Sequence, residues 1–181
     1  MIPLKDIGRS SGMLALIAGV VAAALAGTNA LTKDTIAQRS EQAANEARLQ
    51  VIDADAFTAA TLATEDGEVA YYVAVQNDQT VGYVFTATVS GKSSGLVVMT
   101  GIDTAGAITG VAVTENNETA GYVDKVTDGG LLDAFAGKAA DGALTLGLDV
   151  DSVSQATKTS KGVLDGVNAA IAYYTQIKEG T

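Results

Sequence analysis

Residues 69–89 read VAYYVAVQNDQTVGYVFTATV, and this stretch decides the fold expected of the chain. Its two runs, 69–75 and 81–89, are rich in β-branched and aromatic residues, which is the composition typical of β-strands. Gln76-Asn77-Asp78-Gln79 separates the runs and has the composition of a hairpin loop. The sequence therefore predicts an antiparallel strand pair here.

Further segments with the composition of β-strands follow toward the C-terminus. Residues 96–102 and 107–114 predict a second strand pair, and residues 131–135 predict a short helical piece. Residues 161–178 predict an amphipathic helix, because one side of such a helix carries an apolar stripe. That stripe comprises Val163, Val167, Ala170, Ile171 and Tyr174. We therefore expect residues 51–181 to form a small α+β domain, an antiparallel sheet with helices packed on it.

The N-terminal part differs in character. Residues 12–31, GMLALIAGVVAAALAGTNAL, contain no charged side chain. Twenty helical residues extend roughly 30 Å, which matches the thickness of a bilayer core. Lys5 and Arg9 precede the run, so the positive-inside rule places residues 1–11 in the cytoplasm and the chain after Leu31 outside. The sequence predicts a single transmembrane helix.

A cleaved signal peptide is the alternative, because Ala24-Leu25-Ala26 fits a small-residue cleavage site. We favour the membrane anchor because the apolar run is longer than the h-region of a signal peptide, about 7–15 residues. Residues 32–50 follow as a predicted polar juxtamembrane helix without Gly or Pro. That helix could lie on the membrane surface, lie against a partner or form a solvated stalk.

Composition excludes several classes of function. The chain of 181 residues has 11 Lys and Arg against 21 Asp and Glu, a formal charge of −10. That balance argues against nucleic-acid binding, which needs a basic face. The chain has no Cys and no His, so thiol nucleophiles, His bases and the usual zinc sites are excluded. Any chemistry must therefore come from carboxylates, hydroxyls, Lys, Tyr or a bound cofactor, and we expect no metal site.

Residues 151–160, DSVSQATKTS, hold five hydroxyls directly before the predicted final helix. Thr159 or Ser160 could cap this helix, because hydroxyl oxygens accept hydrogen bonds from free helix N–H groups. A cap leaves Asp151, Ser154 and Thr157 unexplained. A helix N-terminus also favours anions, so phosphate binding is the second interpretation of the cluster.

Asp151, Ser154, Ala156 and Thr157 read D-x-x-S-x-A-T, which resembles the flavinylation motif of FMN-binding domains in Rnf and sodium-pumping NADH:quinone reductase complexes. The resemblance implies that the Thr157 hydroxyl is joined to the phosphate of FMN as a phosphoester, made by a dedicated flavin transferase. Gln155 stands where the family usually has Gly.

The resemblance covers most of the chain, including residues 28–32, 101–111 and 118–121. It implies cofactor contacts from Glu118 and Thr119, in addition to the residues around the attachment point. These are Asp151, Ser154, Ala156, Thr159 and Ser160. We assign no role to Lys125 and Asp128. Tyr71, Tyr72, Tyr83 and Tyr122 are interpreted as core or rim residues rather than flavin-stacking groups.

The chain is most similar in length to the membrane-anchored flavin subunit of Rnf complexes, their G subunit. The resemblance implies an electron-carrier subunit of an ion-translocating ferredoxin:NAD⁺ oxidoreductase in a bacterial or archaeal cytoplasmic membrane. Its implied partners are the other membrane subunits, the flavin transferase and the lipid bilayer, and no independent activity is expected. Two alternatives are the FMN subunit of a quinone reductase or another extracytoplasmic flavin reductase, and a pilin-like structural protein.

Overall fold

The predicted hairpin is present in the computed structural model as strands β2 (Gly67–Gln76) and β3 (Gln79–Ser90). The structure describes residues 18–19, 21, 41–64, 67–116, 118 and 120–180. Asn77 and Asp78 form the two-residue turn with φ values of 51° and 60°. Left-handed backbone at both central residues matches the right-handed twist of the flanking strands, and Asn and Asp tolerate it better than most residues.

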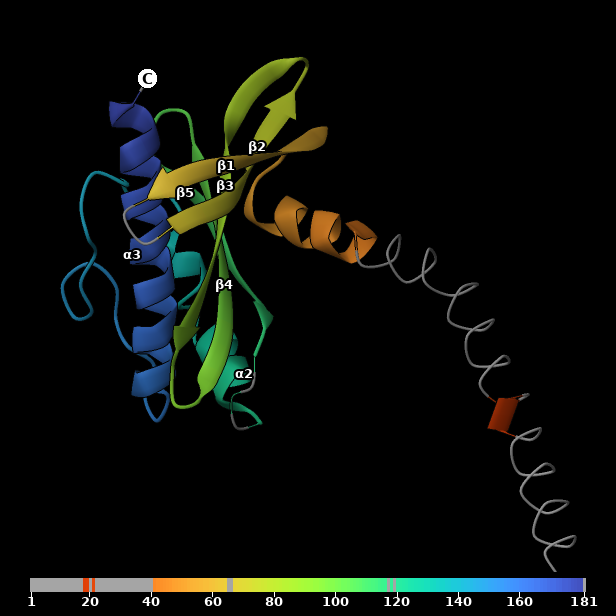
Figure 1. Ribbon diagram of the computed structural model, residues 1–181. Coiled ribbons are helices and arrows are strands. Elements are labelled where there is room, and N and C mark those ends of the chain that lie inside the picture. The colour runs from red at the N-terminus through yellow and green to blue at the C-terminus, as the bar shows by residue number, and fades with distance from the viewer. Residues whose placement is uncertain are drawn as a thin grey trace, which may run out of the picture. The chain divides into compact units, whose positions relative to one another are not determined.

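Three further strands complete the sheet, namely β1 (Ala56–Thr64), β4 (Ser94–Asp103) and β5 (Ile108–Glu115). The strand order is β1-β2-β3-β4-β5, and every neighbouring pair is antiparallel (Figure 1). The predicted pairs are confirmed within a few residues at each end. Strand β1 escaped prediction because its sequence, AFTAATLAT, has few large β-formers.

The helices are α2 (Tyr122–Asp128), the 3₁₀ turn η1 (Asp133–Phe135) and α3 (Thr157–Glu179). The short helical piece at residues 131–135 is confirmed. The final helix begins four residues earlier than the predicted 161–178, so four of the hydroxyl-cluster residues belong to the helix itself. Helix α2 was not predicted, because seven residues are too few for a helical period to be recognised.

The two faces of the sheet carry separate cores. On one face, Phe85, Leu96 and Val98 pack with Val163 and Val167 of α3, and all five side chains are fully buried. Helix α3 runs along this face (Figure 1). On the opposite face, Val84 and Met99 pack with Val51, the last residue of the helical segment 41–51, and with Ile52, which follows it. The α+β fold expected from the sequence is therefore confirmed.

Helix α3 approaches the sheet closely because its contact face carries glycines. A Cβ on Gly162 would lie 2.9 Å from Gly91 Cα and 2.9 Å from the Ser90 carbonyl oxygen. A Cβ on Gly166 would lie 2.6 Å from Val98 Cβ. Real Cβ atoms do not make contacts this short, so the helix reaches this depth only with Gly at both positions.

Glycines also allow a close backbone contact on the opposite face of the sheet. Gly101 and Gly110 are direct cross-strand partners in β4 and β5. The backbone of Val51 lies over this pair, 2.9 Å from the position of a Cβ on Gly110, and Thr109 Oγ1 donates a 2.5 Å hydrogen bond to the Val51 carbonyl oxygen. These contacts fix the C-terminal end of the helical segment 41–51 to the sheet.

The predicted transmembrane segment, residues 12–31, lies outside the described residues apart from residues 18, 19 and 21. In the part of the chain that the structure describes, no helix combines the length and apolar character needed to cross a bilayer. The juxtamembrane helix predicted for residues 32–50 is helical over its described part, from residue 41 onward.

Gly162→Ala should lower the free energy of unfolding by roughly 1–3 kcal/mol, because the added methyl group clashes with the backbone of Gly91 and Ser90. Ala is the better helix former by up to about 1 kcal/mol, so destabilisation would show that packing dominates. Urea denaturation followed by circular dichroism measures the difference. Gly142→Ala is the matched control, since nothing lies within 4 Å of its Cβ position. An equal effect in both variants would contradict the close packing.

Candidate functional site

Three segments that are distant in sequence meet at the N-terminal end of α3. They are the β3–β4 turn with Lys92, the start of α2 with Tyr122, and the first turn of α3 with the residues before it. Together they line an open pocket with a volume of about 310 Å³. The pocket is lined by Lys92, Tyr122, Gln155, Ala156, Thr157, Lys158 and Thr159. This volume lies at the lower end of the range for ligand pockets, about 300–1,000 Å³.

Thr157 is the first residue of α3, and its side chain is exposed at this pocket. The cap position is Ala156, and no side chain caps the helix. The expectation that Thr159 or Ser160 caps α3 was therefore wrong. Because the helix begins at Thr157, both residues lie within its first turn and neither occupies the cap position. The free N–H groups of this turn and the positive end of the helix dipole face the neighbourhood of Thr157.

Ser160 fastens the preceding loop to the helix. Its buried Oγ accepts a hydrogen bond from the Val153 N–H and donates one to the Ala156 carbonyl oxygen, both at 3.1 Å. Ala156 is also buried, and its N–H donates to the Val153 carbonyl oxygen at 3.0 Å. Ser160 thus shapes the loop that presents Thr157, and its own hydroxyl is fully shielded.

Gln155 adopts left-handed backbone, with φ 64°. This conformation is costly for residues with a Cβ and free for Gly. The structure therefore gives a physical reason why Gly suits this position of the motif. The Gln155 side chain accepts a 3.2 Å hydrogen bond from Lys125 Nζ, which ties the loop to α2.

Glu118 joins two walls of the site. Its carboxylate accepts a 3.0 Å hydrogen bond from the Ser93 N–H in the β3–β4 turn and a longer one, 3.4 Å, from Thr159 Oγ1 in α3. Gly91 lies directly against the same carboxylate, with no space for a Cβ. Glu118 therefore holds the β3–β4 turn against the start of α3.

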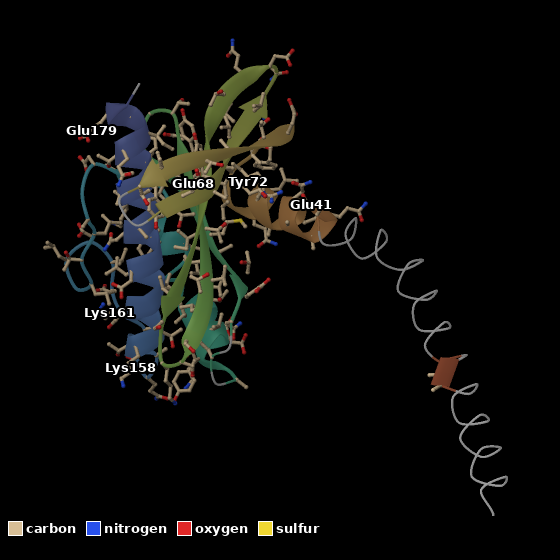
Figure 2. The ribbon with its side chains drawn as sticks, in the orientation of Figure 1. Glu41, Glu68, Tyr72, Lys158, Lys161 and Glu179 are labelled. Carbon is tan, nitrogen blue, oxygen red and sulfur yellow. The ribbon has the colours of Figure 1, made fainter. Side chains whose placement is uncertain are left out.

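Positive charge gathers around the pocket of this acidic chain. Lys92 Nζ donates a 2.8 Å hydrogen bond to the Tyr122 hydroxyl oxygen and lies 3.9 Å from the ring centroid. That hydrogen bond and the charge of Lys92 lower the pKa of Tyr122 below 10.0, and the charge of Lys125 acts in the same direction. Lys158 lines the same pocket from α3 and lies at its N-terminal end, far from Glu179 (Figure 2).

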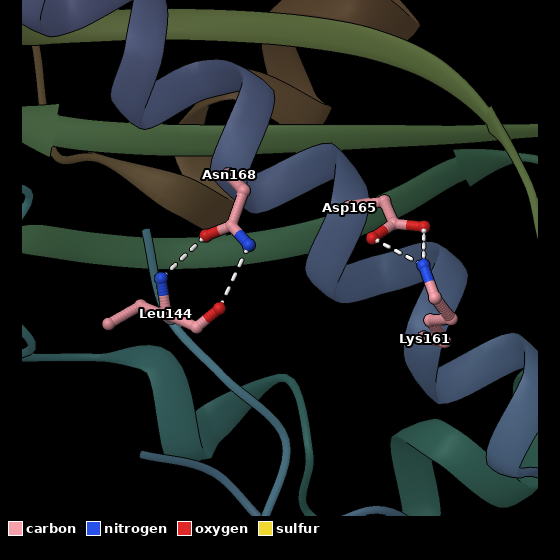
Figure 3. Close-up of polar contacts among 4 residues, drawn as sticks. All are labelled: Leu144, Lys161, Asp165 and Asn168. Carbon is pink, nitrogen blue, oxygen red and sulfur yellow. Dashed lines mark hydrogen bonds and ion pairs between the residues drawn. The ribbon is translucent and has the colours of Figure 1, made fainter. Parts of the chain in front are cut away.

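The long connection from η1 to α3 is also fixed further along the helix. Asn168 Oδ1 accepts the Leu144 N–H at 2.8 Å, and Asn168 Nδ2 donates to the Leu144 carbonyl oxygen at 2.9 Å (Figure 3). On the exposed side of α3, Lys161 pairs with Asp165 at 2.6 Å (Figure 3). The loop that ends at Gln155 is thus held at Leu144 and again at Val153.

The structure brings together part of the expected site. Ala156, Thr157 and Thr159 line the pocket, and Glu118 supports it from behind. Asp151 and Ser154 are exposed in the preceding loop and are not among the described residues that line the pocket. Thr119 lies outside the described residues.

Sequence reasoning missed the role of two residues. Lys92 had no assigned role, and Tyr122 was interpreted only as a core or rim residue. Both residues line the pocket beside Thr157. The one local signal was the position of Lys92 in a tight turn between two predicted strands, which does not indicate what lies opposite that turn.

These features form a pocket whose surroundings favour an anionic group. An exposed hydroxyl stands at the uncapped N-terminus of a long helix, and a lysine reaches the same pocket from another element. Helix N–H groups, the helix dipole and an ammonium group all favour an anion. The donor set therefore fits the phosphate of a flavin nucleotide.

Comparison with known proteins identifies the family. The family model of the FMN-binding domain matches residues 91–172, and the family model of the RnfG N-terminal region matches residues 1–51. The chain is 31% identical to the G subunit of the Na⁺-translocating ferredoxin:NAD⁺ oxidoreductase complex of Acetobacterium woodii, over 92% of this chain and 91% of that protein. It is 32% identical to the G subunit of the ion-translocating oxidoreductase complex of Escherichia coli K12, over 94% and 92%.

A third relative is the G subunit of the proton-translocating ferredoxin:NAD⁺ oxidoreductase complex of Clostridium ljungdahlii, 28% identical over 91% of this chain and 88% of that protein. The chain belongs to the family of G subunits of ion-translocating oxidoreductase complexes. The resemblance seen in the sequence is confirmed, and the pilin-like alternative was wrong.

Gln155→Gly should raise the free energy of unfolding by about 0.5–1 kcal/mol, because it removes the left-handed strain at this position. Thermal unfolding of the purified chain measures the change. Gln155→Ala keeps a Cβ and loses the Lys125 hydrogen bond, so it should bring no gain. Equal stability of the Gly and Ala variants would show that the strain is absent.

Proposed function

We propose that this chain is a single-pass membrane subunit of an ion-translocating ferredoxin:NAD⁺ oxidoreductase and carries FMN covalently on Thr157. The observation that carries the proposal is the position of Thr157: an exposed hydroxyl at the uncapped start of α3, inside a pocket lined by lysines. Membership of the family of G subunits supports the assignment of FMN and of the complex.

Each wall of the pocket has a part in holding the cofactor. Thr157 provides the attachment oxygen, and the N–H groups in the first turn of α3 face the phosphate attached there. Glu118 keeps the β3–β4 turn in place against α3, and we propose a cofactor contact for it and for Thr119. Bound FMN would supply the electron transfer that side chains of a protein without Cys, His or Trp cannot perform.

A covalent link would prevent loss of the cofactor from an exposed site outside the membrane. A free flavin would be lost by dilution, whereas a tether keeps its effective concentration high. In the attachment step the Thr157 Oγ–phosphorus bond forms, the bond from phosphorus to the leaving group of an activated flavin nucleotide breaks, and the hydroxyl proton passes to a base of the flavin transferase. The product is a phosphodiester with one negative charge.

Thr157→Ala should abolish covalent flavin completely, because no other oxygen occupies this position. The chain is co-expressed with a flavin transferase, and its intact mass is measured after denaturation. The wild type should gain the mass of FMN less one water. Thr127→Ala removes an exposed threonine from α2 and is the matched control, which should remain fully loaded. Retention of the adduct in Thr157→Ala would overturn the attachment site.

We also propose that residues 12–31 cross the bacterial or archaeal cytoplasmic membrane with the N-terminus inside and the domain outside. Neighbouring subunits of the complex and the lipid bilayer are then its partners. The absence of Cys makes this directly testable with single introduced cysteines.

An impermeant maleimide applied to intact spheroplasts should label Asp141→Cys and should leave Ser10→Cys unlabelled until the membrane is opened. The physical reason is that Lys5 and Arg9 retain the N-terminus on the cytoplasmic side. Labelling of Ser10→Cys in intact spheroplasts would reverse the orientation. A mature chain that begins after Ala26 would instead establish the signal-peptide alternative.

A further inference from the structure

We propose that Lys92 is the side chain that pairs with the flavin phosphate, and that Tyr122 is the positioning residue that holds its ammonium group at the pocket. This inference deepens the proposed function and rests on it for the identity of the ligand. It concerns the part of the site that the attachment motif leaves undefined, because the motif lies far beyond Lys92 in the sequence.

The backbone on both sides of Lys92 is fixed. Gly91 packs against α3, where a Cβ would lie 3.2 Å from Thr159 Cα, and it also meets Gly162 of the same helix. The Ser93 N–H donates its 3.0 Å hydrogen bond to Glu118. Lys92 therefore projects from a turn whose backbone packs directly against the start of α3, where Thr157 lies.

The ammonium group of Lys92 is positioned without being neutralised. Its partner is the Tyr122 hydroxyl at 2.8 Å, and within the described residues Lys92 forms no ion pair. A lysine ammonium group has three N–H donors, so the bond to Tyr122 leaves two for phosphate oxygens. A cation that is already held in place loses less conformational entropy when it binds an anion than a mobile one does.

The other two lysines are less suited to this role. Lys125 donates to Gln155 at 3.2 Å and is not among the described residues that line the pocket. Lys158, which is exposed like Lys92, lies on the helix next to Thr157, but no hydrogen bond or ion pair with another described residue holds its side chain. Lys92 combines a place in the pocket with a fixed direction, so we assign the phosphate contact to it.

The test separates the phosphate from the rest of the flavin. The full-length chain with Thr157→Ala, which cannot form the covalent link, is titrated with FMN and with riboflavin, which lacks the phosphate, and binding is followed by flavin fluorescence. Thr157→Ala should bind FMN more tightly than riboflavin. Adding Lys92→Met should weaken FMN binding about tenfold, or about 1.4 kcal/mol, and leave riboflavin binding unchanged. Lys178→Met, which removes a positive charge at the far end of α3, should change neither.

Tyr122→Phe tests the positioning role. In the Thr157→Ala background it should weaken FMN binding about threefold without affecting riboflavin. On top of Lys92→Met it should have no further effect, because residues that act through one contact are not additive. A merely structural role would weaken both flavins or add to the loss in the double variant.

Three results would overturn the assignment to Lys92: equal affinity of Thr157→Ala for FMN and riboflavin, an unchanged FMN affinity after Lys92→Met, or an equal loss for both flavins. Phosphorus NMR of the loaded chain provides a second measurement, in which Lys92→Met should shift the phosphodiester resonance and Lys178→Met should not. An absent adduct in the wild type contradicts the covalent link alone, since the Thr157→Ala titration does not depend on it.

Discussion

The contact between α3 and the β3–β4 hairpin is the constraint on which the site depends. Gly162 lets the helix backbone rest on Gly91 and on the carbonyl of Ser90. No side chain intervenes, so the distance between the helix start and the turn is set by backbone packing, which does not relax as a side chain can. Two of the residues that line the pocket are positioned by this contact: Thr157 stands five residues before Gly162, and Lys92 directly follows Gly91.

The sheet between the two cores receives a backbone contact on each face. On the face away from α3, the glycine pair of β4 and β5 accommodates the backbone of Val51, which Thr109 holds by a hydrogen bond. The helical residues from 45 to 51 are therefore part of the same compact unit as the site. This arrangement fixes residues 45–51 to the sheet that positions the pocket.

The site is surrounded by positive charge, whereas the chain as a whole is negatively charged. A formal charge of −10 repels anions at long range. Lysines on three different elements, Lys92, Lys125 and Lys158, gather at one end of α3, where the helix dipole adds to their field. The proposed covalent link would suit this situation, because a tethered cofactor would be loaded once and would not need repeated capture by an acidic protein.

By itself, the sequence determined the strand pairs and the amphipathic final helix, because hydrophobic periodicity is a local property that can be recognised without coordinates. A contiguous motif led in the same way to the proposal of Thr157 as the attachment residue. The predicted start of the final helix and its predicted capping residue were wrong. The helix begins at Thr157, Ala156 occupies the cap position, and the Ser160 hydroxyl accepts a hydrogen bond from the Val153 N–H. Only the tertiary structure decided that Lys92 and Tyr122 stand beside Thr157. Their proximity follows from the register of the strands and from the close approach of α3 to the sheet, which its glycines allow. Neither the register nor the distance of approach can be recognised in a single local segment of the sequence.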